Sequence, residues 1–192
     1  ETHCLLDLAR NHDCVKAVVG WADLCADDLE SVLDQLCGAR ELRGLRPAVQ
    51  GEPDQQVLRR SEFQEGARKL AARDLVYDIL IYPRQLDAAV AFARALPDQA
   101  LVLDHLAKPN IAQLDTAAWQ PGFEALGELE HVSCKVSGMV TEAKWNQWSA
   151  DDFRHYLDTA LAVFGPDRLM FGSDWPVCLL AANEYQDVYQ LV

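Results

Sequence analysis

Two ionisable clusters in this sequence stand at the ends of apolar runs, where strand propensity would not place them. RLMFGSDWP, residues 168–176, begins as a buried apolar run and leads to the carboxylate of Asp174. ALVLDHLAKP, residues 100–109, ends its apolar run in Asp104 and His105. Carboxylates are poor strand formers and are costly to bury unpaired. An acid that can take a proton from water and an imidazole that can polarise a carbonyl are the groups that a hydrolytic site needs.

Each of these residues also has a plain structural interpretation. Asp174 can be a solvated residue at a strand end or the N-cap of a turn, and His105 can be a hydrogen-bonded core histidine. Both apolar runs end in ionisable residues followed by a proline. This repeated pattern favours a shared site, because the C-terminal ends of parallel strands meet at one face of an α/β sheet. We therefore expect His105 and Asp174 to point into the same cavity.

The elements that would position these residues alternate along the chain. Six runs have the composition of strands: residues 15–21, 41–49, 75–82, 100–105, 131–138 and 169–171. Amphipathic helical patterns occupy residues 5–10, 29–36, 61–71, 86–96, 119–129 and 150–164. Capping boxes are predicted at two helix starts, Ser61 with Gln64 and Ser149 with Asp152. This alternation predicts an α/β fold with a parallel sheet.

Composition narrows the class of protein. The 192 residues form a single predicted domain, 1–192, of which half is apolar. The formal charge of −13 disfavours nucleic acid or an anionic membrane as a partner. No apolar run approaches the ~18 residues of a membrane span, and no signal peptide is evident, so we expect a cytoplasmic location with the six cysteines reduced. Helical patterns at both ends lead us to expect a domain truncated at both ends.

Polar or amphipathic residues follow every predicted strand. They are Trp21, Asp23, Arg46, Tyr82, Asp104, His105, Lys135, Ser137 and Asp174. Loops are solvated, so part of this set is expected simply to face water. Neither GxGxxG nor GxxxxGK[ST] follows a strand, which removes the main support for a nucleotide-binding fold.

Five sequence strings together carry a specific resemblance. LVLDHLAKPNI and DRLMFGSDWPVC, with GWADL, LVYDILIYPRQL and CKVSG in the same order, resemble the amidohydrolase-related family of TIM-barrel hydrolases, in its branch of sugar-acid and pyrone-dicarboxylate lactonases. The resemblance covers essentially the whole chain. It implies a TIM (β/α)8 barrel, present here as a partial barrel with strands three to eight. The HxH motif that such proteins carry on their first strand is missing from this sequence.

The resemblance implies roles for individual residues. Asp174 matches a general base that activates water, and His105 a residue that polarises the carbonyl or binds a metal. At most one divalent ion, zinc, is implied, with His105 and Asp174 as ligands and the remaining ligands missing. Arg46 is expected to hold a substrate carboxylate or lactone oxygen.

Three further substrate-binding residues are expected: Tyr82, Lys135 and Trp175. For Lys135, a polar strand end without a function is an equal alternative. For Asp78, which also fits the family pattern, a buried structural carboxylate paired with a neighbour is the favoured interpretation.

The leading hypothesis is a hydrolase that opens a sugar-derived or dicarboxylate lactone, a small-molecule substrate. A metal-dependent decarboxylase of the same superfamily is the alternative enzyme. An inactive barrel fragment with a binding or structural role is the alternative of another class, motivated by the absent HxH. The sequence does not indicate which lactone is cleaved or the oligomeric state.

Overall fold

The sheet is a run of parallel strands in chain order. The structure, a computed structural model, describes residues 1–192. Its six strands pair in the order β1-β2-β3-β4-β5-β6, and every pairing is parallel. The strands are β1 (Val18–Gly20), β2 (Leu42–Leu45), β3 (Val76–Ile79), β4 (Leu101–Leu103), β5 (Val132–Val136) and β6 (Leu169–Phe171). The parallel α/β sheet predicted from the sequence is confirmed.

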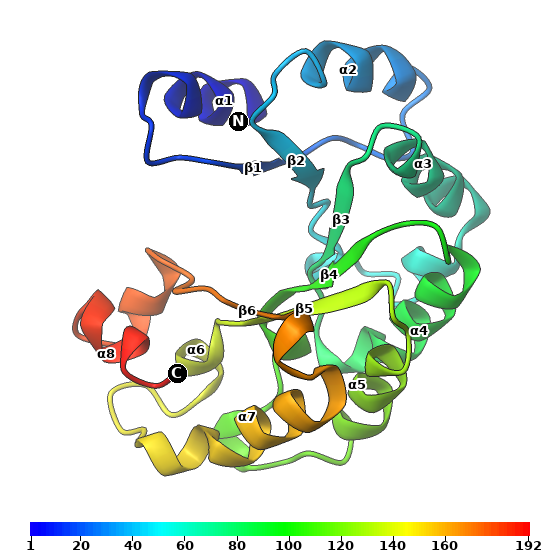
Figure 1. The fold of residues 1–192 in the computed structure, drawn as a ribbon. Helices are drawn as coiled ribbons and strands as arrows, with labels where there is room; N and C mark the ends of the chain where they lie inside the picture. The colour runs from blue at the N-terminus through cyan, green and yellow to red at the C-terminus, as the bar shows by residue number, and fades with distance from the viewer.

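The helices lie along the outside of the curved sheet. They are α1 (Thr2–Asn11), α2 (Leu29–Leu36), α3 (Ser61–Ala71), α4 (Leu86–Ala95), α5 (Gln120–Gly127), α6 (Met139–Glu142), α7 (Ala150–Phe164) and α8 (Tyr185–Tyr189). One arm of the resulting C shape carries α1 and β1, and the other carries β6 and α8, with an opening between them (Figure 1). The fold is a partial TIM barrel, as expected. None of the helices combines the length and apolarity required to cross a membrane.

The two predicted capping boxes have different outcomes. At α7, Ser149 N–H donates to Asp152 Oδ2 at 2.8 Å, and the capping box is present. At α3 the prediction is wrong, because Arg60 takes the extended N-cap position and Ser61 is already the first helical residue. Gln64 instead donates from Nε2 to the carbonyl of Leu58 at 3.2 Å.

The core lies between the helices and the outer face of the sheet. Outward-facing strand residues such as Leu45, Tyr77 and Leu101 are at most 1% exposed and packed side by side in register. The aromatic rings of Phe63, Tyr77 and Phe92 meet at centroid distances of 5.3–6.0 Å. This layer fixes the strand register, because a shift by one residue would turn these side chains to the opposite face.

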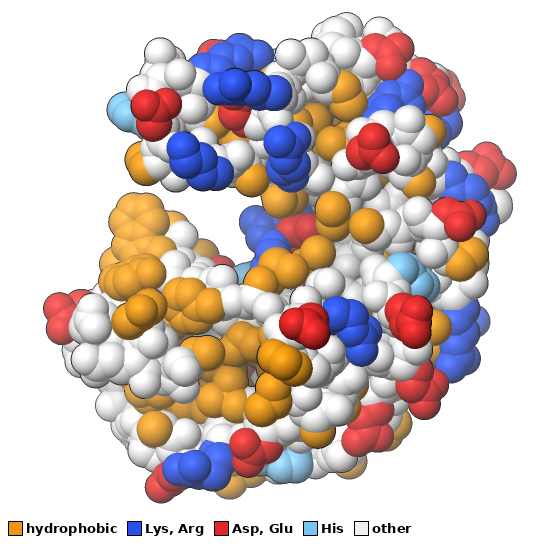
Figure 2. Space-filling view, viewed as in Figure 1, with side chains coloured by type: hydrophobic (Ala, Val, Ile, Leu, Met, Phe, Trp, Pro, Cys, Tyr) orange, Lys and Arg blue, Asp and Glu red, His pale blue; other side chains and the backbone are white.

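The inner face of the same strands differs in chemistry. Asp78 lies beside Val102 in register, and Lys135 lies beside Met170. Charged side chains therefore gather on the concave side, at the base of the hollow between the two arms (Figure 2). The fold turns an apolar face toward its helices and a charged face toward the opening.

Candidate active site

His105 and Asp174 meet across the end of β5. His105 Nε2 lies 3.5 Å from Asp174 Oδ1, and the two side chains are 8% and 15% exposed. Ser137, directly after β5, places its hydroxyl 2.8 Å from His105 Nδ1. Three consecutive strand exits, those of β4, β5 and β6, thus bring an imidazole, a hydroxyl and a carboxylate together. With Nδ1 engaged by Ser137, Nε2 is the ring nitrogen that faces Asp174.

The surroundings of the His105 ring favour its neutral form. Burial lowers the pKa of His105 below its ordinary value, and this effect exceeds the opposing influence of the charges on Asp104 and Asp174. A neutral imidazole can carry its proton on Nε2 while Nδ1 accepts the hydroxyl proton of Ser137. In that tautomer, Nε2–H is a hydrogen-bond donor at the candidate site.

Beside His105, a network of buried charges crosses the inner face. Lys135 Nζ contacts Asp78 Oδ2 and lies 2.7 Å from Asp104 Oδ1, and Arg46 Nη1 lies 3.1 Å from Asp104 Oδ2. Both carboxylates are buried. Burial and the charge of Asp104 raise the pKa of Asp78, against the opposing effect of Lys135. Burial alone would lower the pKa of Lys135, but the charges of Asp104 and Asp78 outweigh it and raise that pKa.

The network places two of the sequence-predicted binding residues. Arg46 and Lys135 both form ion pairs with Asp104, the residue that precedes His105. Asp78 is a buried carboxylate paired with Lys135, which agrees with the interpretation favoured from the sequence. The sequence did not indicate this pairing of Asp104, because Arg46 directly follows β2 and Lys135 lies in β5, both far from Asp104 in the chain.

Tyr82 lines a second hollow near the His105–Asp174 pair. This cavity of about 330 Å³ is lined by Tyr82, Lys108 and Glu142 among others. Lys108 Nζ lies 5.3 Å from the Tyr82 ring centroid and 3.8 Å from Glu142 Oε1. Burial and the charge of Asp174 raise the pKa of Glu142, against Lys108, so this hollow adjoins Asp174 electrostatically. The sequence interpretation gave no role to Lys108 or Glu142, although Lys108 is the lysine of the LVLDHLAKPNI string.

The backbone around His105 is unusual. His105, Leu106, Ala107 and Lys108 all adopt left-handed conformations, with φ between 51° and 57°. Left-handed geometry costs about 1–2 kcal/mol for each residue with a side chain. Gly138 closes against this turn, since a Cβ at its position would lie 2.7 Å from His105 Cγ. Ser137 and Gly138, the last two residues of the CKVSG string, therefore both lie against His105.

Trp175, next to Asp174, is mostly exposed, with 63% of its surface accessible. It makes no side-chain hydrogen bond, and its backbone N–H donates to Ser173 Oγ at 3.2 Å. The structure places Trp175 at the rim of the site, whereas His105, Ser137 and Asp104 form its buried floor.

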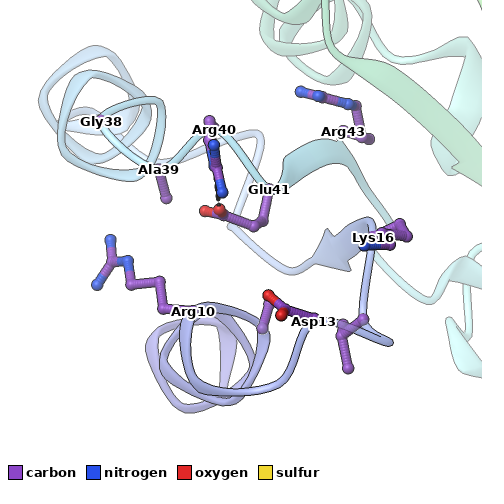
Figure 3. A pocket seen from close by; sticks show the side chains of 10 residues that line it. Arg10, Asp13, Lys16, Gly38, Ala39, Arg40, Glu41 and Arg43 are labelled. Carbon is purple, nitrogen blue, oxygen red and sulfur yellow. Dashed lines mark hydrogen bonds and ion pairs between the residues drawn. The ribbon is translucent and has the colours of Figure 1, made fainter.

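Another hollow lies elsewhere on the molecule. Its volume is about 620 Å³, and it is formed where β1 and β2 begin, at the edge of the sheet opposite His105 (Figure 3). Its lining includes Arg10 and Arg40, which pair with Asp7 at 3.0 Å and with Glu41 at 2.7 Å. This hollow contains no histidine, and two of its cations are neutralised by neighbouring carboxylates. We therefore assign the candidate site to the C-terminal ends of the strands.

The side chains of this chain do not by themselves complete a metal centre. Catalytic zinc sites use three protein ligands and an open position. His105 and Asp174 supply two donors, and no group of three or more His, Cys, Asp or Glu side chains is arranged to hold a metal ion. The donor set of these 192 residues is therefore one ligand short of such a site.

Comparison with known proteins places the chain in a family. The amidohydrolase family model matches residues 2–192. The chain is 45% identical to an L-fucono-1,5-lactonase of Burkholderia multivorans, covering 100% of this chain and 68% of that protein. It is 37% identical to an L-fucono-1,5-lactonase of Burkholderia ambifaria, covering 95% of this chain and 63% of that protein.

Solved structures agree with the sequence comparisons. A crystal structure of an amidohydrolase from Burkholderia multivorans with bound zinc superimposes with a TM-score of 0.92 at 46% identity. The match covers 99% of this chain and 69% of that one. A family match over nearly every residue, together with this structural agreement, shows that the chain belongs to the amidohydrolase family of hydrolases.

Proposed function

We propose that this chain carries the catalytic base and the carbonyl-polarising residue of a lactonase that opens a sugar-derived or dicarboxylate lactone. The observation that carries the proposal is the approach of His105 Nε2 to Asp174 Oδ1, 3.5 Å apart at the exits of two strands. The names of the two Burkholderia relatives support lactone hydrolysis as the reaction. Because the chain spans only about two thirds of those relatives, the activity is proposed for the protein that contains it.

The proposed reaction uses the two side chains in one step. Asp174 takes a proton from water as the oxygen attacks the lactone carbonyl. His105, neutral and protonated on Nε2, donates a hydrogen bond to the carbonyl oxygen as negative charge develops there. When the ring C–O bond breaks, the proton on Asp174 passes to the departing alkoxide, and the product is an open-chain hydroxy acid. Ser137 holds the ring orientation through Nδ1.

The cations of the buried network have donors to spare for a substrate. Arg46 uses Nη1 for Asp104, while 42% of its side chain remains exposed. A guanidinium has five N–H donors, so those left can hold a carboxylate or lactone oxygen. Lys135 uses two of its three donors for Asp78 and Asp104 and is 22% exposed. The third donor is proposed to reach the substrate.

Tyr82 and Trp175 complete the proposed binding surface. Tyr82 lines the hollow beside Lys108, and Arg84 and Lys108 lie over its ring at 4.7 and 5.3 Å from the centroid. Trp175 offers an exposed ring beside Asp174, and such an aromatic face suits the apolar C–H face of a sugar ring. Both roles remain predictions.

For metal binding, the proposal states only how many ligands this chain supplies. His105 and Asp174 are the two donors that this chain offers a divalent ion, whereas the zinc-bound crystal structure is that of a relative. A bound zinc ion would act as a Lewis acid on the carbonyl. The proposed reaction steps do not involve this ion, because the side chains of residues 1–192 do not complete a zinc site.

The decisive experiment replaces the proposed base. Asp174→Asn keeps the shape of the side chain and removes the proton acceptor, so kcat for aldonolactone opening should fall by on the order of 10²-fold. His105→Asn should cost a comparable factor, and the two losses should be far from additive because both residues serve one step. Proton release from aldonolactones is measured beside CO2 release from aromatic acids, in the full-length protein.

A matched control is available at another strand exit. Asp23 follows β1, is exposed, and accepts a hydrogen bond from Cys25 N–H at 2.9 Å, which an asparagine can also accept. Asp23→Asn should leave kcat unchanged. CO2 release without lactone opening would replace the proposal with decarboxylation, and the absence of both activities would favour a non-catalytic role.

A further inference from the structure

The turn that carries His105 needs an external support. Residues 105–108 are four consecutive non-glycine residues in left-handed conformation, and none of them is Asn or Asp, which tolerate that region best. Runs of this kind persist only where the surrounding structure holds them. Within the turn, Lys108 N–H donates to the His105 carbonyl at 2.8 Å. This bond closes the turn and leaves the carbonyl of Leu106, at its centre, without a partner inside it.

The partner of that carbonyl is a tryptophan from another element. Trp119 Nε1 donates to the Leu106 carbonyl oxygen at 2.6 Å, and the contact is buried. Trp119 immediately precedes α5, and its ring is fully buried. It stacks on Phe123 at 4.4 Å between centroids and meets Tyr156 edge-on at 5.3 Å. The indole is therefore fixed by the core on one side and holds the turn on the other.

Two functional side chains depend on the direction of this turn. His105, at its start, points to Asp174, and Lys108, at its end, points to Glu142. The Leu106 peptide lies between them, so rotation of its carbonyl away from the indole would redirect the backbone at both. A displacement of about 1 Å in a catalytic group can cost on the order of 10²-fold in rate.

We propose that Trp119 is a positioning residue of this site: its indole N–H, by holding the Leu106 carbonyl, fixes the left-handed turn that aims His105 at Asp174 and Lys108 at Glu142. Trp119 is fully buried and forms part of the wall of the Tyr82 cavity, and it acts on His105 through the turn. The kinetic part of this inference rests on the proposed lactonase function. The geometric part rests only on the turn.

The test removes the N–H and keeps the ring. Trp119 is replaced by 3-benzothienylalanine, in which sulfur takes the place of the indole N–H, and by phenylalanine as a second variant. In full-length protein, kcat for lactone opening should fall roughly tenfold while KM changes less than about twofold, because orientation rather than binding is lost. Hydrogen exchange of the Lys108 amide should accelerate at least about tenfold, because its bond to His105 closes the turn.

A double variant separates positioning from general stabilisation. In the His105→Asn background, removing the Trp119 N–H should change kcat less than about twofold, because its effect passes through His105. Trp148 supplies the matched control, since its Nε1 donates to the Ala181 carbonyl at the same 2.6 Å and its ring packs on Phe153. The same replacement at Trp148 should leave Lys108 exchange unchanged.

The outcomes are distinct. Wild-type kcat and wild-type Lys108 exchange in the benzothienyl variant would overturn the proposal. An equal loss of kcat in the His105→Asn background, or faster exchange throughout the chain, would reduce Trp119 to a core residue and overturn it as well. If the wild-type protein opens no lactone, the proposed function fails, and Lys108 exchange alone decides whether Trp119 holds the turn.

Discussion

The exits of β4 and β6 share one sequence pattern but lie in different surroundings. Each is an apolar run followed by ionisable residues and a proline. The exit of β4 lies between β3 and β5, and Asp104, Leu106 and Ala107 are fully buried there. The strand β6 pairs only with β5, and its Met170 and Phe171 are 38% and 41% exposed. Within these 192 residues, the two acids therefore lie in different packing environments.

This difference gives the two acids different roles. Asp104 is surrounded by protein and is neutralised by Lys135 and Arg46, as a buried carboxylate must be. Asp174 has only His105 within ion-pair distance and keeps partial access to the opening. Both carboxylate oxygens of Asp104 contact a cation, whereas the ion-pair contact of Asp174 is to an imidazole alone. The comparison therefore supports the proposal that Asp104 stabilises the fold and Asp174 acts on water.

The largest expected effect comes from breaking the central network. Lys135→Met leaves Asp78 without its cation and Asp104 with only the partly exposed Arg46, so the free energy of unfolding should fall by about 3–5 kcal/mol. Urea denaturation of the full-length protein measures it. Arg154→Met, which breaks the solvated pair with Asp151, is the control and should leave stability near that of the wild type.

The pH dependence of the Lys135→Met deficit follows from Asp78. Burial raises the pKa of Asp78 above the value of 3.8 expected in the unfolded chain, and Lys135 opposes that rise. Without Lys135 the folded-state pKa rises further, so the folded state binds this proton more tightly than the unfolded state. Stability is then lost as pH rises through the window above 3.8. The deficit should be smaller near pH 4 than near pH 7, and a deficit that grows on acidification would contradict the network.

The sequence patterns predicted the strands and helices better than the geometry of the candidate site. Apolar runs located all six strands, because core burial enforces them. Several predicted runs were longer than the strands observed, as with residues 15–21 for Val18–Gly20, 41–49 for Leu42–Leu45 and 75–82 for Val76–Ile79. The convergence of His105 with Asp174 followed from their positions at strand exits. The left-handed turn could not be predicted, because Leu, Ala and Lys have no preference for it and histidine alone does not specify a run of four. Its contacts with Trp119 and Gly138 are both tertiary.

A smaller effect is expected at Arg46, which connects the central network to the opening. Arg46→Met should raise KM for an anionic or lactone substrate roughly tenfold, since one charge-assisted hydrogen bond is lost, with kcat little changed. Lys135 continues to neutralise Asp104, so the protein should stay folded. Arg46→Lys is the matched variant, because it keeps the charge but not the planar fork. Unchanged KM with reduced kcat would instead give Arg46 a transition-state role.

The smallest expected effect lies at the rim of the edge exit. Trp175 exposes 63% of its surface, so Trp175→Ala should change the free energy of unfolding by less than about 0.5 kcal/mol. If its ring covers the bound lactone beside Asp174, the lost apolar contact of about 1 kcal/mol should raise KM roughly fivefold and leave kcat nearly unchanged. Leu161→Ala changes an apolar residue on α7 that is 53% exposed, controls for loss of exposed surface and should leave KM unchanged. Steady-state kinetics on one aldonolactone distinguishes the two variants. Equal KM values for the two variants would remove Trp175 from the binding surface and leave Asp174 as the one contribution of the β6 exit. A fall in kcat at constant KM would show that the indole orients Asp174 rather than the substrate.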